Sequence, residues 1–454
     1  MVTATSKLRS LGQRAYRARR ITLTFGRIYF GIKANQLIAR HTNDIEMQLR
    51  WAKFNQTSAE AIFKTAVELR GLILKGCQFI GSRSDVLPPE YCEVLSQLQD
   101  RVPPRPFSEI RAVVERELGE PLEQAFSDFS EASAAAASLA QVHSAHLPDG
   151  RRVAVKVQYP EIRELVQSDL SNLGALFRAT GLIERNFDLM PLVEELAEHM
   201  PRELDFCNEG MNAERVAKFF ENRKDVVVPS IEWELTTTRV LVSEFIEGIK
   251  ITDTKRLDEA GIDRTAVMQS LVEAYCEQIL VYGFFHADPH PGNLMVLPPT
   301  AQNQPPRIVF LDFGLAKQLP PAFRKSAVEF AAALLQGNPK AMGSALVDLG
   351  FETRGGSHEA LERVAQVLLD VAKRLRNQTY LEPGILREAG QSLSRLIREN
   401  PVVHIPSHVV LLVRVFGLLS GLGNILGVKL DMLQTILPYA AGQSPHHSPG
   451  KESS

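Results

Sequence analysis

The segment from His286 to Asn293, with the sequence HADPHPGN, constrains this chain more than any other feature, because an Asp-Phe-Gly triplet begins nineteen residues later at Asp312. Asp288 and Asn293 are five residues apart, and the apolar run 308–311 leads into Asp312 as a short strand would. In phosphoryl-transfer sites this spacing joins an aspartate that orients the nucleophile to an asparagine and an aspartate that bind Mg²⁺. Mg²⁺ prefers such hard oxygen ligands. We therefore predict Asp288 as a catalytic residue, and Asn293 and Asp312 as metal ligands.

Zinc is the alternative metal for this segment. His286 and His290 are four residues apart, a spacing that serves zinc when a helix presents both imidazoles on one face. Pro289 and Pro291 interrupt the stretch, so a regular helix is not expected and magnesium is favoured. The four cysteines are far apart and form no C-x-x-C pair, which predicts neither a zinc site nor a disulfide framework and favours a reducing compartment.

A second feature is an alanine-rich stretch, and Lys156 stands fourteen residues after its last residue. The small side chains follow the spacing G-x-G-x-x-G-x-V of the phosphate loop of kinases. Alanine reaches positive φ less readily than glycine, so we expect a stiffer loop than a glycine-rich one. The candidate phosphate-binding residues are Ala135, Ala137, Ser138, Ala140 and Val142. Read alone, an alanine run is more typical of a helix.

Lys156 lies in a predicted strand. Val153, Val155 and Val157 alternate with more polar residues, and the turn 148–150 joins them to a partner strand over 141–146 as an antiparallel hairpin. A lysine on such a strand can bind the α- and β-phosphates of a nucleotide when a carboxylate holds its ammonium group. Read alone, it is a solvent-facing strand lysine.

Carboxylates for this purpose occur in the segment 203–209, with the sequence ELDFCNE. We assign Glu209 to an ion pair with Lys156, and Glu203 and Asp205 to the rim of the nucleotide site. An ordinary acidic helix face is the alternative. Glu244, near the end of the strand-like run 239–245, is a further candidate for nucleotide binding.

The pattern of elements predicts mixed architecture. No strand pattern is found before Ala134. Helices are expected over 58–75 with a break near Gly81, after Pro88 and Pro89, over 161–180 and over 191–222. Strands are expected at 153–157, 226–228, 239–245 and 308–311.

These elements predict an α+β chain with a two-lobed protein-kinase-like fold and a helical N-terminal extension. The expected domains are the extension over residues 1–125, an N-lobe with the alanine-rich loop over 126–247, a helical C-lobe over 248–440, and a disordered tail over 441–454. The near-neutral formal net charge of -2 gives no sign of nucleic-acid binding.

The first forty residues contain nine lysines and arginines and no acidic residue. Phe25, Ile28, Tyr29 and Ile32 recur at helical spacing, so the segment is a basic amphipathic helix. Two interpretations remain open: a segment that binds an anionic membrane surface or targets an organelle, and a helix that packs on the main body. Farther on, the run 415–428 has about fourteen residues without charge, short of the roughly twenty that span a bilayer, and predicts a buried helix.

Taken in order, these motifs resemble the UbiB/ADCK atypical kinases, also called AarF-domain proteins. Members have an alanine-rich loop, an E-x-D motif, H-x-D-P-H-P-G-N and D-F-G. They also have K-x-G-Q in the helical extension, here Lys75 to Gln78, with Cys77 in place of the family glycine. The resemblance implies that Lys75 and Gln78 gate the nucleotide site. It also implies that the extension covers the place where a protein substrate would dock.

The resemblance further implies ATP (or ADP) and Mg²⁺ as cofactors and an atypical kinase or ATPase that supports ubiquinone or other prenyl-lipid biosynthesis. A membrane lipid or prenyl-quinone precursor and quinone-biosynthesis proteins are the implied partners. The implied location is cytoplasmic and peripheral at the inner membrane in a bacterium, or mitochondrial or plastid in a eukaryote. Two rivals stay open: a protein or small-molecule phosphotransferase, and a nucleotide-gated lipid-binding scaffold with little turnover.

Overall fold

The computed structural model describes residues 4–39, 42–81, 87–99, 104–183, 190–299, 304–353, 358–377, 402–404, 406–428 and a few isolated positions beyond them. The predicted tail over 441–454 lies outside the described residues. The chain divides into two compact units, one made of Met1–Asn208 with Ile231–Phe245 and the other of Glu209–Ser230 with Ile246–Ser454. Both helix and sheet are present, as the sequence predicts. The boundaries expected at residues 125 and 247 remain predictions.

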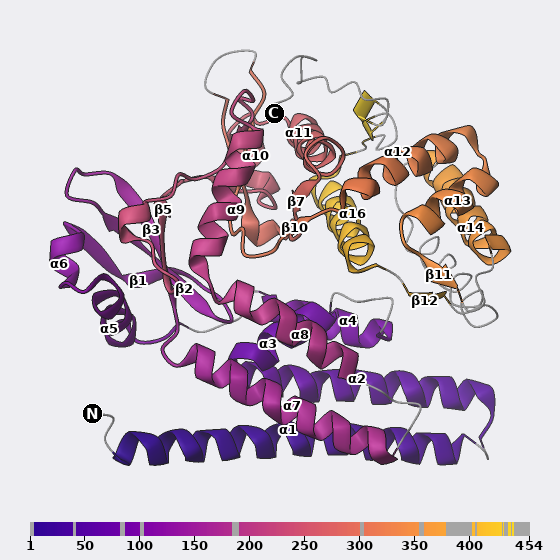
Figure 1. Ribbon diagram of the computed structural model, residues 1–454, viewed down its shortest axis with the longest axis horizontal. Coiled ribbons are helices and arrows are strands. Elements are labelled where there is room, and N and C mark those ends of the chain that lie inside the picture. The colour runs from indigo at the N-terminus through magenta and orange to yellow at the C-terminus, as the bar shows by residue number, and fades with distance from the viewer. Residues whose placement is uncertain are drawn as a thin grey trace. The chain divides into compact units, whose positions relative to one another are not determined.

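The first unit contains a four-stranded antiparallel sheet (Figure 1). Its strands, in spatial order, are β1 (Asp128–Ala136), β2 (Ala140–His146), β3 (Arg152–Gln158) and β5 (Val240–Glu244). The predicted hairpin is confirmed, with Val142 opposite Lys156. The expectation of no strand before Ala134 is wrong. β1 is an edge strand whose register shifts between Phe129 and Ala135, so its residues do not alternate in burial and show no period of two.

The two faces of this sheet differ. Val153, Val155 and Val157 are at most 1% exposed and form a core with the helices α5 (Phe107–Leu118) and α6 (Leu122–Ala125). Because side chains alternate along a strand, Lys156 projects from the opposite face. The larger hydrophobic core therefore occupies one face of the sheet, and Lys156 lies on the other face.

A layer of helices completes the first unit. It comprises α1 (Ala4–Ile38), α2 (Asp44–Leu69), α3 (Gly71–Gly81), α4 (Pro89–Ser96) with the short helix η1 (Gln97–Gln99), α7 (Ile162–Ile183) and α8 (Met190–Glu203). Helix α1 packs against both α2 and α7 (Figure 1). The packing interpretation of the basic N-terminal helix holds for its buried face, because the Phe25 and Phe177 ring centroids are 5.5 Å apart.

Two helix boundaries differ from the sequence prediction. The helix expected over 58–75 ends at Leu69, because Arg70 adopts a positive φ of 55° that interrupts the helical backbone before α3. The stretch expected over 191–222 is two helices, α8 and α9 (Phe206–Phe219). Asp205 separates them, and its Oδ1 accepts a hydrogen bond from the Cys207 amide, which caps the start of α9.

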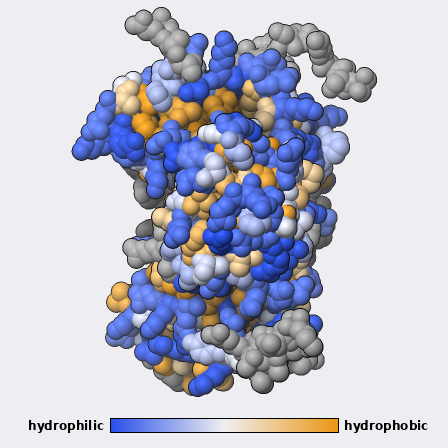
Figure 2. Space-filling model, turned by 90° about the vertical axis from the view of Figure 1, so that its left-hand side faces the viewer, coloured by the Kyte–Doolittle hydropathy of each residue, from blue (hydrophilic) through white to orange (hydrophobic). Residues whose placement is uncertain are grey.

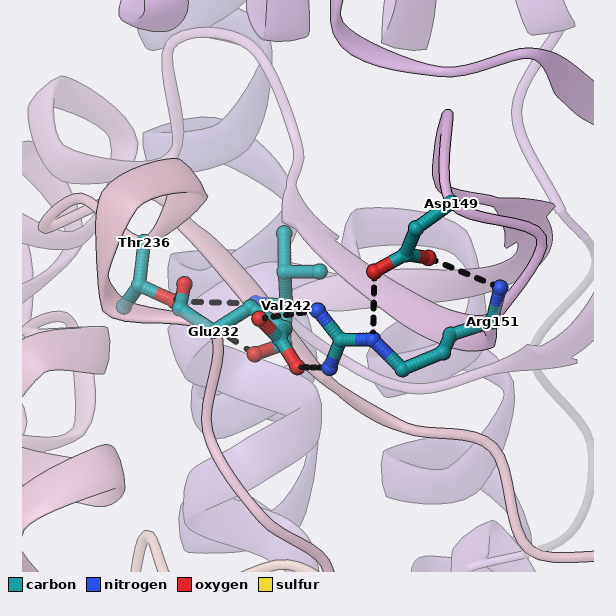
Figure 3. A network of polar contacts seen from close by, with 5 residues as sticks. All are labelled: Asp149, Arg151, Glu232, Thr236 and Val242. Carbon is teal, nitrogen blue, oxygen red and sulfur yellow. Dashed lines mark hydrogen bonds and ion pairs between the residues drawn. The ribbon is translucent and has the colours of Figure 1, made fainter.

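A surface network fixes the turn between β2 and β3 (Figure 3). Arg151 donates from Nε to Asp149 Oδ2 at 2.7 Å and also pairs with Glu232. The Glu232 amide donates to the Val242 carbonyl at 2.9 Å, and Thr236 Oγ1 donates to the Glu232 carbonyl. The turn is thereby tied to the segment that leads into β5. Arg151 is mostly exposed, so the network orients this edge more than it stabilises the unit.

The second unit is built around a mixed sheet in the order β4 (Val226–Val227), β9 (Arg307–Phe310), β8 (Leu294–Leu297) and β6 (Ile249–Lys250). The other strands are β7 (Phe284–His286) with β10 (Ala316–Gln318), and β11 (Glu352–Thr353) with β12 (Val402–His404). The helices are α10 (Thr254–Glu259), α11 (Arg264–Cys276), the π-helical turn η3 (Glu277–Val281), η4 (Pro291–Asn293), α12 (Pro321–Gln336), α13 (Pro339–Asp348), α14 (His358–Asn377) and α16 (Ser407–Leu426). A short 3₁₀ turn, η2 (Trp233–Leu235), belongs to the first unit.

The apolar run that was expected as a buried helix forms most of α16. Val415 and Leu419 are fully buried, whereas Phe416 and Ile425 are 39% and 49% exposed, so only one side of the helix is covered. Among the described residues, no helix is both long enough and apolar enough to cross a bilayer. The molecular face drawn in Figure 2 is mostly hydrophilic, with separate hydrophobic patches between the polar residues.

Candidate nucleotide and metal site

The predicted catalytic loop connects β7 to β8, and the predicted metal loop follows β9. β8 and β9 are antiparallel neighbours in which Leu294 pairs with Phe310. The Leu311 amide donates to the Asn293 carbonyl at 2.8 Å, which continues the pairing by one more residue. Because Asn293 precedes β8 and Asp312 follows β9, this register brings both predicted metal ligands to the same end of the hairpin.

Asn293 contacts the predicted catalytic aspartate directly. Its Nδ2 donates to the Asp288 carbonyl at 3.2 Å and to Asp288 Oδ2 at 3.3 Å. An amide has separate donor and acceptor ends, so these bonds direct the asparagine nitrogen toward Asp288 and leave its Oδ1 as an oxygen ligand. The arrangement fits the metal-binding role predicted for Asn293.

Asp312 has an unusual backbone conformation. Its φ is 52°, one of three positive values at non-glycine positions in the described chain. Its Oδ1 accepts from the Gly314 amide at 3.1 Å, and its carbonyl accepts from His286 Nε2 at 2.7 Å. A non-glycine residue in this region persists only where the surroundings hold it, and such residues concentrate at functional sites. The metal-binding role of the Asp312 carboxylate stays a prediction.

His286 links the two loops from a fully buried position. The Asp312 carbonyl can only accept, so Nε2 carries the hydrogen and Nδ1 is the acceptor for the Tyr275 hydroxyl at 3.1 Å. Burial raises the pKa of Tyr275 well above its usual value, and the charge of Asp288 raises it further. Tyr275 thus stays a donor, and the histidine serves as a structural link between the loops.

The π-helical turn η3 also supports the catalytic loop. Gln278, in this turn, is fully buried, and its Oε1 accepts from the His286 amide at 2.9 Å. π-Helical turns are rare overall, but those that occur are frequently found at functional sites. Here the turn contains Gln278, whose hydrogen bond holds the residue that precedes the catalytic loop.

Helix α9 contacts the metal loop through its first two turns. Asn212 Nδ2 donates to the Phe313 carbonyl at 3.1 Å. Glu209 is 4% exposed, and a Cβ atom added to Gly314 would lie 3.6 Å from Glu209 Oε2 and 3.2 Å from Asp312 Oδ1. Both carboxylates therefore lie close to the backbone of the glycine in the Asp-Phe-Gly triplet. The predicted ion pair of Glu209 with Lys156 stays a prediction.

Lys156 projects over an apolar surface. Its Nζ lies 5.2 Å from the centroid of the Phe206 ring, and Phe206 forms a buried cluster with Ala140 and Leu241. The strand register places Leu241 directly beside Lys156. An ammonium group next to a flat apolar patch suits a ligand with phosphates at one end and an aromatic ring at the other.

The alanine-rich stretch is mostly strand. Ala135 lies in β1, which ends at Ala136, and Ala140 and Val142 lie in β2. Only residues 137–139 form the turn, with the Ala137 amide donating to the Ala140 carbonyl at 2.8 Å. The Tyr159 hydroxyl donates to the Ala137 carbonyl at 3.0 Å. Every alanine here has a negative φ, so the turn does not use the conformations that require glycine. Ser138, predicted to contact phosphate, is 5% exposed.

The strand register limits what Glu244 can do. It lies opposite Val153, and thus on the face of the buried valines and not on the face of Lys156. The exposed Glu244 side chain therefore points away from the lysine. A nucleotide on the lysine face could meet only the main chain of this residue.

One ion pair connects two of the motifs in the helical layer. Lys75 Nζ and Glu203 Oε2 are 3.1 Å apart, which connects the K-x-G-Q-like segment to the E-x-D segment. Gln78 instead donates to the Leu98 carbonyl at 3.0 Å. Cys77, which replaces the family glycine, is half-buried, and desolvation of its thiol raises the pKa to about 12. Asp205 acts as the cap of α9 described above.

Four supporting residues were absent from the sequence prediction: Tyr159, Tyr275, Gln278 and Arg414. The first three are polar residues among apolar neighbours in the sequence. Many core positions have this pattern, so it does not single out a functional residue. Arg414 had a clearer signal, because it is a lone charge in the apolar sequence of α16. Its Nη2 contacts Asp288 Oδ1 at 2.6 Å.

This fold and this pair of loops define an atypical kinase-like protein. The model of the ABC1 atypical kinase-like domain matches residues 97–346, more than half of the chain. The chain therefore belongs to the ABC1 atypical kinase-like family.

Relatives with curated names agree with this placement. AarF domain-containing protein kinase 1 of Xenopus tropicalis is 33% identical over 425 residues, which cover 89% of this chain and 79% of that protein. The chloroplastic ACTIVITY OF BC1 COMPLEX KINASE 8 of Arabidopsis thaliana is 33% identical over 412 residues, or 84% of this chain. This chain spans only 53% of the length of that plant protein.

A solved structure has the same fold. The complex of Rv3197 with erythromycin from Mycobacterium tuberculosis matches with a TM-score of 0.60 and 23% identity. The match covers 85% of this chain and 96% of that one.

Proposed function

We propose that the protein binds Mg-ATP and transfers the γ-phosphoryl group to water or to a small acceptor. The observation that carries the proposal is the β8–β9 hairpin, whose register brings Asp288, Asn293 and Asp312 together around one loop end. Two oxygen ligands beside a carboxylate form a donor set that suits Mg²⁺. When bound, the ion would neutralise charge on the phosphates.

The proposal assigns a role in the reaction to each of the other site residues. Asp288 accepts a hydrogen bond from the attacking hydroxyl or water, whose oxygen bonds to the γ-phosphorus as the bond to the β–γ bridging oxygen breaks and ADP leaves. Lys156 binds the α- and β-phosphates, and Glu209 holds its ammonium group. The turn after β1 offers backbone amides, and the main chain near Glu244 meets the base. The proton of the nucleophile passes to solvent through Asp288.

The test is Mg²⁺-dependent ATP turnover. Asp312→Asn retains the shape of the side chain but removes a charge from the metal site, so we expect turnover to fall by about two orders of magnitude or more. Asp348→Asn is the matched control, because Asp348 is an exposed aspartate of α13 in the same unit. If Asp312→Asn hydrolyses ATP like the wild type, the metal assignment is wrong.

Transfer to an added protein or small molecule, with little hydrolysis, would favour the phosphotransferase alternative. Nucleotide binding with no product at all would favour a nucleotide-gated scaffold. Both outcomes are distinguished by following ADP and the labelled γ-phosphate in one assay.

The second part of the proposal places this reaction at a membrane surface, in support of ubiquinone or other prenyl-lipid biosynthesis. On α1, Tyr16, Leu23, Phe30 and Leu37 are 51%, 54%, 71% and 62% exposed and follow one another at intervals of seven residues. Seven residues are nearly two helical turns, so the four side chains form a stripe along one side of the helix. The sequence of α1 has basic residues and no acidic ones around this stripe. A single apolar row between cations suits an anionic lipid surface better than a coiled-coil seam, which needs two apolar positions per heptad.

Flotation with anionic vesicles tests this part. Phe30→Ser should reduce the vesicle-bound fraction, whereas Leu335→Ser, at a residue 40% exposed on α12, should not. Adding a prenyl-quinone precursor to the vesicles should increase ATP turnover. Equal flotation of both variants would show that α1 does not bind the membrane.

A further inference from the structure

The apolar helix α16 contains one strongly charged residue. Arg414 is the only Lys, Arg, Asp or Glu among its twenty residues, and its side chain is 13% exposed. Burial of a guanidinium group is costly unless a carboxylate meets it. The carboxylate that meets it belongs to Asp288, 126 residues earlier in the chain, with Arg414 Nη2 and Asp288 Oδ1 at 2.6 Å.

Both oxygens of the Asp288 carboxylate are therefore engaged by donors. Arg414 binds Oδ1, and Asn293 Nδ2 binds Oδ2 at 3.3 Å. One donor comes from the catalytic loop itself and the other from the C-terminal helix. Two donors on opposite oxygens fix the plane of the carboxylate, and the bond from the charged guanidinium is the stronger one.

We infer that Arg414 is a positioning residue for Asp288. The inference rests on the proposed phosphoryl transfer and names a residue on which its rate depends. By holding Oδ1, Arg414 keeps the carboxylate in the orientation that accepts the hydrogen bond of the nucleophile. Its positive charge also offsets that of the carboxylate, so that Asp288 repels an incoming triphosphate less. The orientation of Asp288 in the catalytic loop thus depends on the packing of α16.

A purely stabilising ion pair is the competing explanation. Asp288 is 25% exposed, so water could solvate its carboxylate without an arginine. Arg414 Nε, in contrast, is buried and has no hydrogen-bond partner among the described residues. An arginine retained for stability alone would be expected to satisfy its buried donors. The unsatisfied Nε of Arg414 therefore favours a role in orienting Asp288 over a role in stability alone.

The experiment compares Arg414→Gln, Arg414→Lys and Arg264→Gln with the wild type in steady-state ATP hydrolysis. Arg264 is the matched control, because its Nη1 donates to the Leu426 carbonyl at the far end of the same helix at 2.8 Å and does not belong to the proposed catalytic loop. Misorientation of a reacting group by about 1 Å lowers rates about 10²-fold. We expect kcat of Arg414→Gln to fall by this order with KM for ATP nearly unchanged, partial recovery in Arg414→Lys, and no fall in Arg264→Gln.

A double-variant cycle shows whether Arg414 acts through Asp288. In the Asp288→Asn background, Arg414→Gln should lower kcat no further, because the group that it orients is already altered. Should Arg414→Gln be poorly folded, Arg414→Ala with added guanidinium ion replaces it, and recovery of turnover by the ion supports positioning. Equal kcat in Arg414→Gln and wild type, or additive losses in the cycle, would overturn the inference and leave the proposed function intact. A wild-type protein without turnover would overturn both.

Discussion

Arg17 lies at the junction of three helices of the first unit, and its removal is the most informative test of how α1 belongs to the fold. Arg17 is 3% exposed, and its Nε donates to Asp169 Oδ1 of α7 at 2.9 Å. It also donates to the carbonyl of Leu69 at the end of α2 and, at 3.4 Å, to that of Arg70. Asp169 is fully buried.

Arg17→Met leaves a buried carboxylate without its cation, a change that costs about 3–5 kcal/mol in comparable pairs. The sequence expectation of a membrane or targeting segment predicts no such cost. If α1 detaches as one unit, this energy corresponds to amide exchange in residues 4–38 that is about 10²–10⁴ times faster. The measurement is hydrogen exchange by mass spectrometry of the full chain.

The pH dependence has a definite sign. Burial raises the pKa of Asp169 although the hydrogen bonds and charge of Arg17 lower it. A carboxyl whose pKa is higher in the folded state stabilises fully below its unfolded pKa of about 3.9 and loses that contribution as pH rises through the folded value. Removal of Arg17 raises the folded pKa further. The penalty of Arg17→Met should therefore be smaller near pH 4 than at pH 7.

Two further variants decide the argument. Arg20→Met is the matched control. Arg20 lies on α1, like Arg17, but its ion pair with Glu68 is more exposed, so this variant should leave the exchange rate near that of the wild type. Arg17→Met combined with Asp169→Leu should recover most of the protection, since both charges are then gone. Exchange in Arg17→Met equal to that in Arg20→Met, or a double variant no better than the single one, would refute the reasoning.

Three other outcomes are expected. Tyr159→Phe removes the hydroxyl bond to the alanine-rich turn, so the Kd for a fluorescent ADP should rise about 2–10-fold, while Tyr282→Phe, which loses a similar bond to a carbonyl of α9, should leave it unchanged. Desolvation raises the pKa of the half-buried Cys77 thiol to about 12, so maleimide at pH 8 should label it slowly in the native protein and rapidly after unfolding; rapid labelling of native protein would contradict the raised pKa. Burial alone would raise the pKa of Asp225, but Arg223 lowers it below its usual value. The ionised carboxylate therefore stabilises the folded protein at pH values above its unfolded pKa. This contribution is lost as the pH falls through the lower pKa of the folded state. Arg223→Met should cost about 3–5 kcal/mol at pH 7 and less in acid, as measured by denaturant unfolding; a pH-independent cost would refute this.

The sequence predicted the parts of the site that depend on local spacing. The five-residue interval from Asp288 to Asn293 and the apolar run before Asp312 are confirmed as a loop and a strand of one hairpin. The alternation around Lys156 is confirmed as β3. Such features follow from backbone geometry over a few residues, and nearby positions in the sequence contain all the information that is needed.

Long-range pairing was decided only by tertiary structure. Arg17 is one of nine basic residues in the first forty, and nothing in the sequence distinguishes it from Arg20, yet packing buries one pair and leaves the other far more exposed. The break at Arg70 is likewise invisible locally, because the residue is helix-compatible and adopts a positive φ among contacts from another helix.

The contact of Arg414 with Asp288 is the clearest case. The sequence marks a lone charge in an apolar helix and a conspicuous aspartate far upstream, but any of many carboxylates could have met the arginine. Burial selected the partner, because a guanidinium enclosed by apolar side chains is tolerated only where the fold delivers an opposite charge. Local spacing thus indicated the candidate site residues, and packing decided which distant residues contact them.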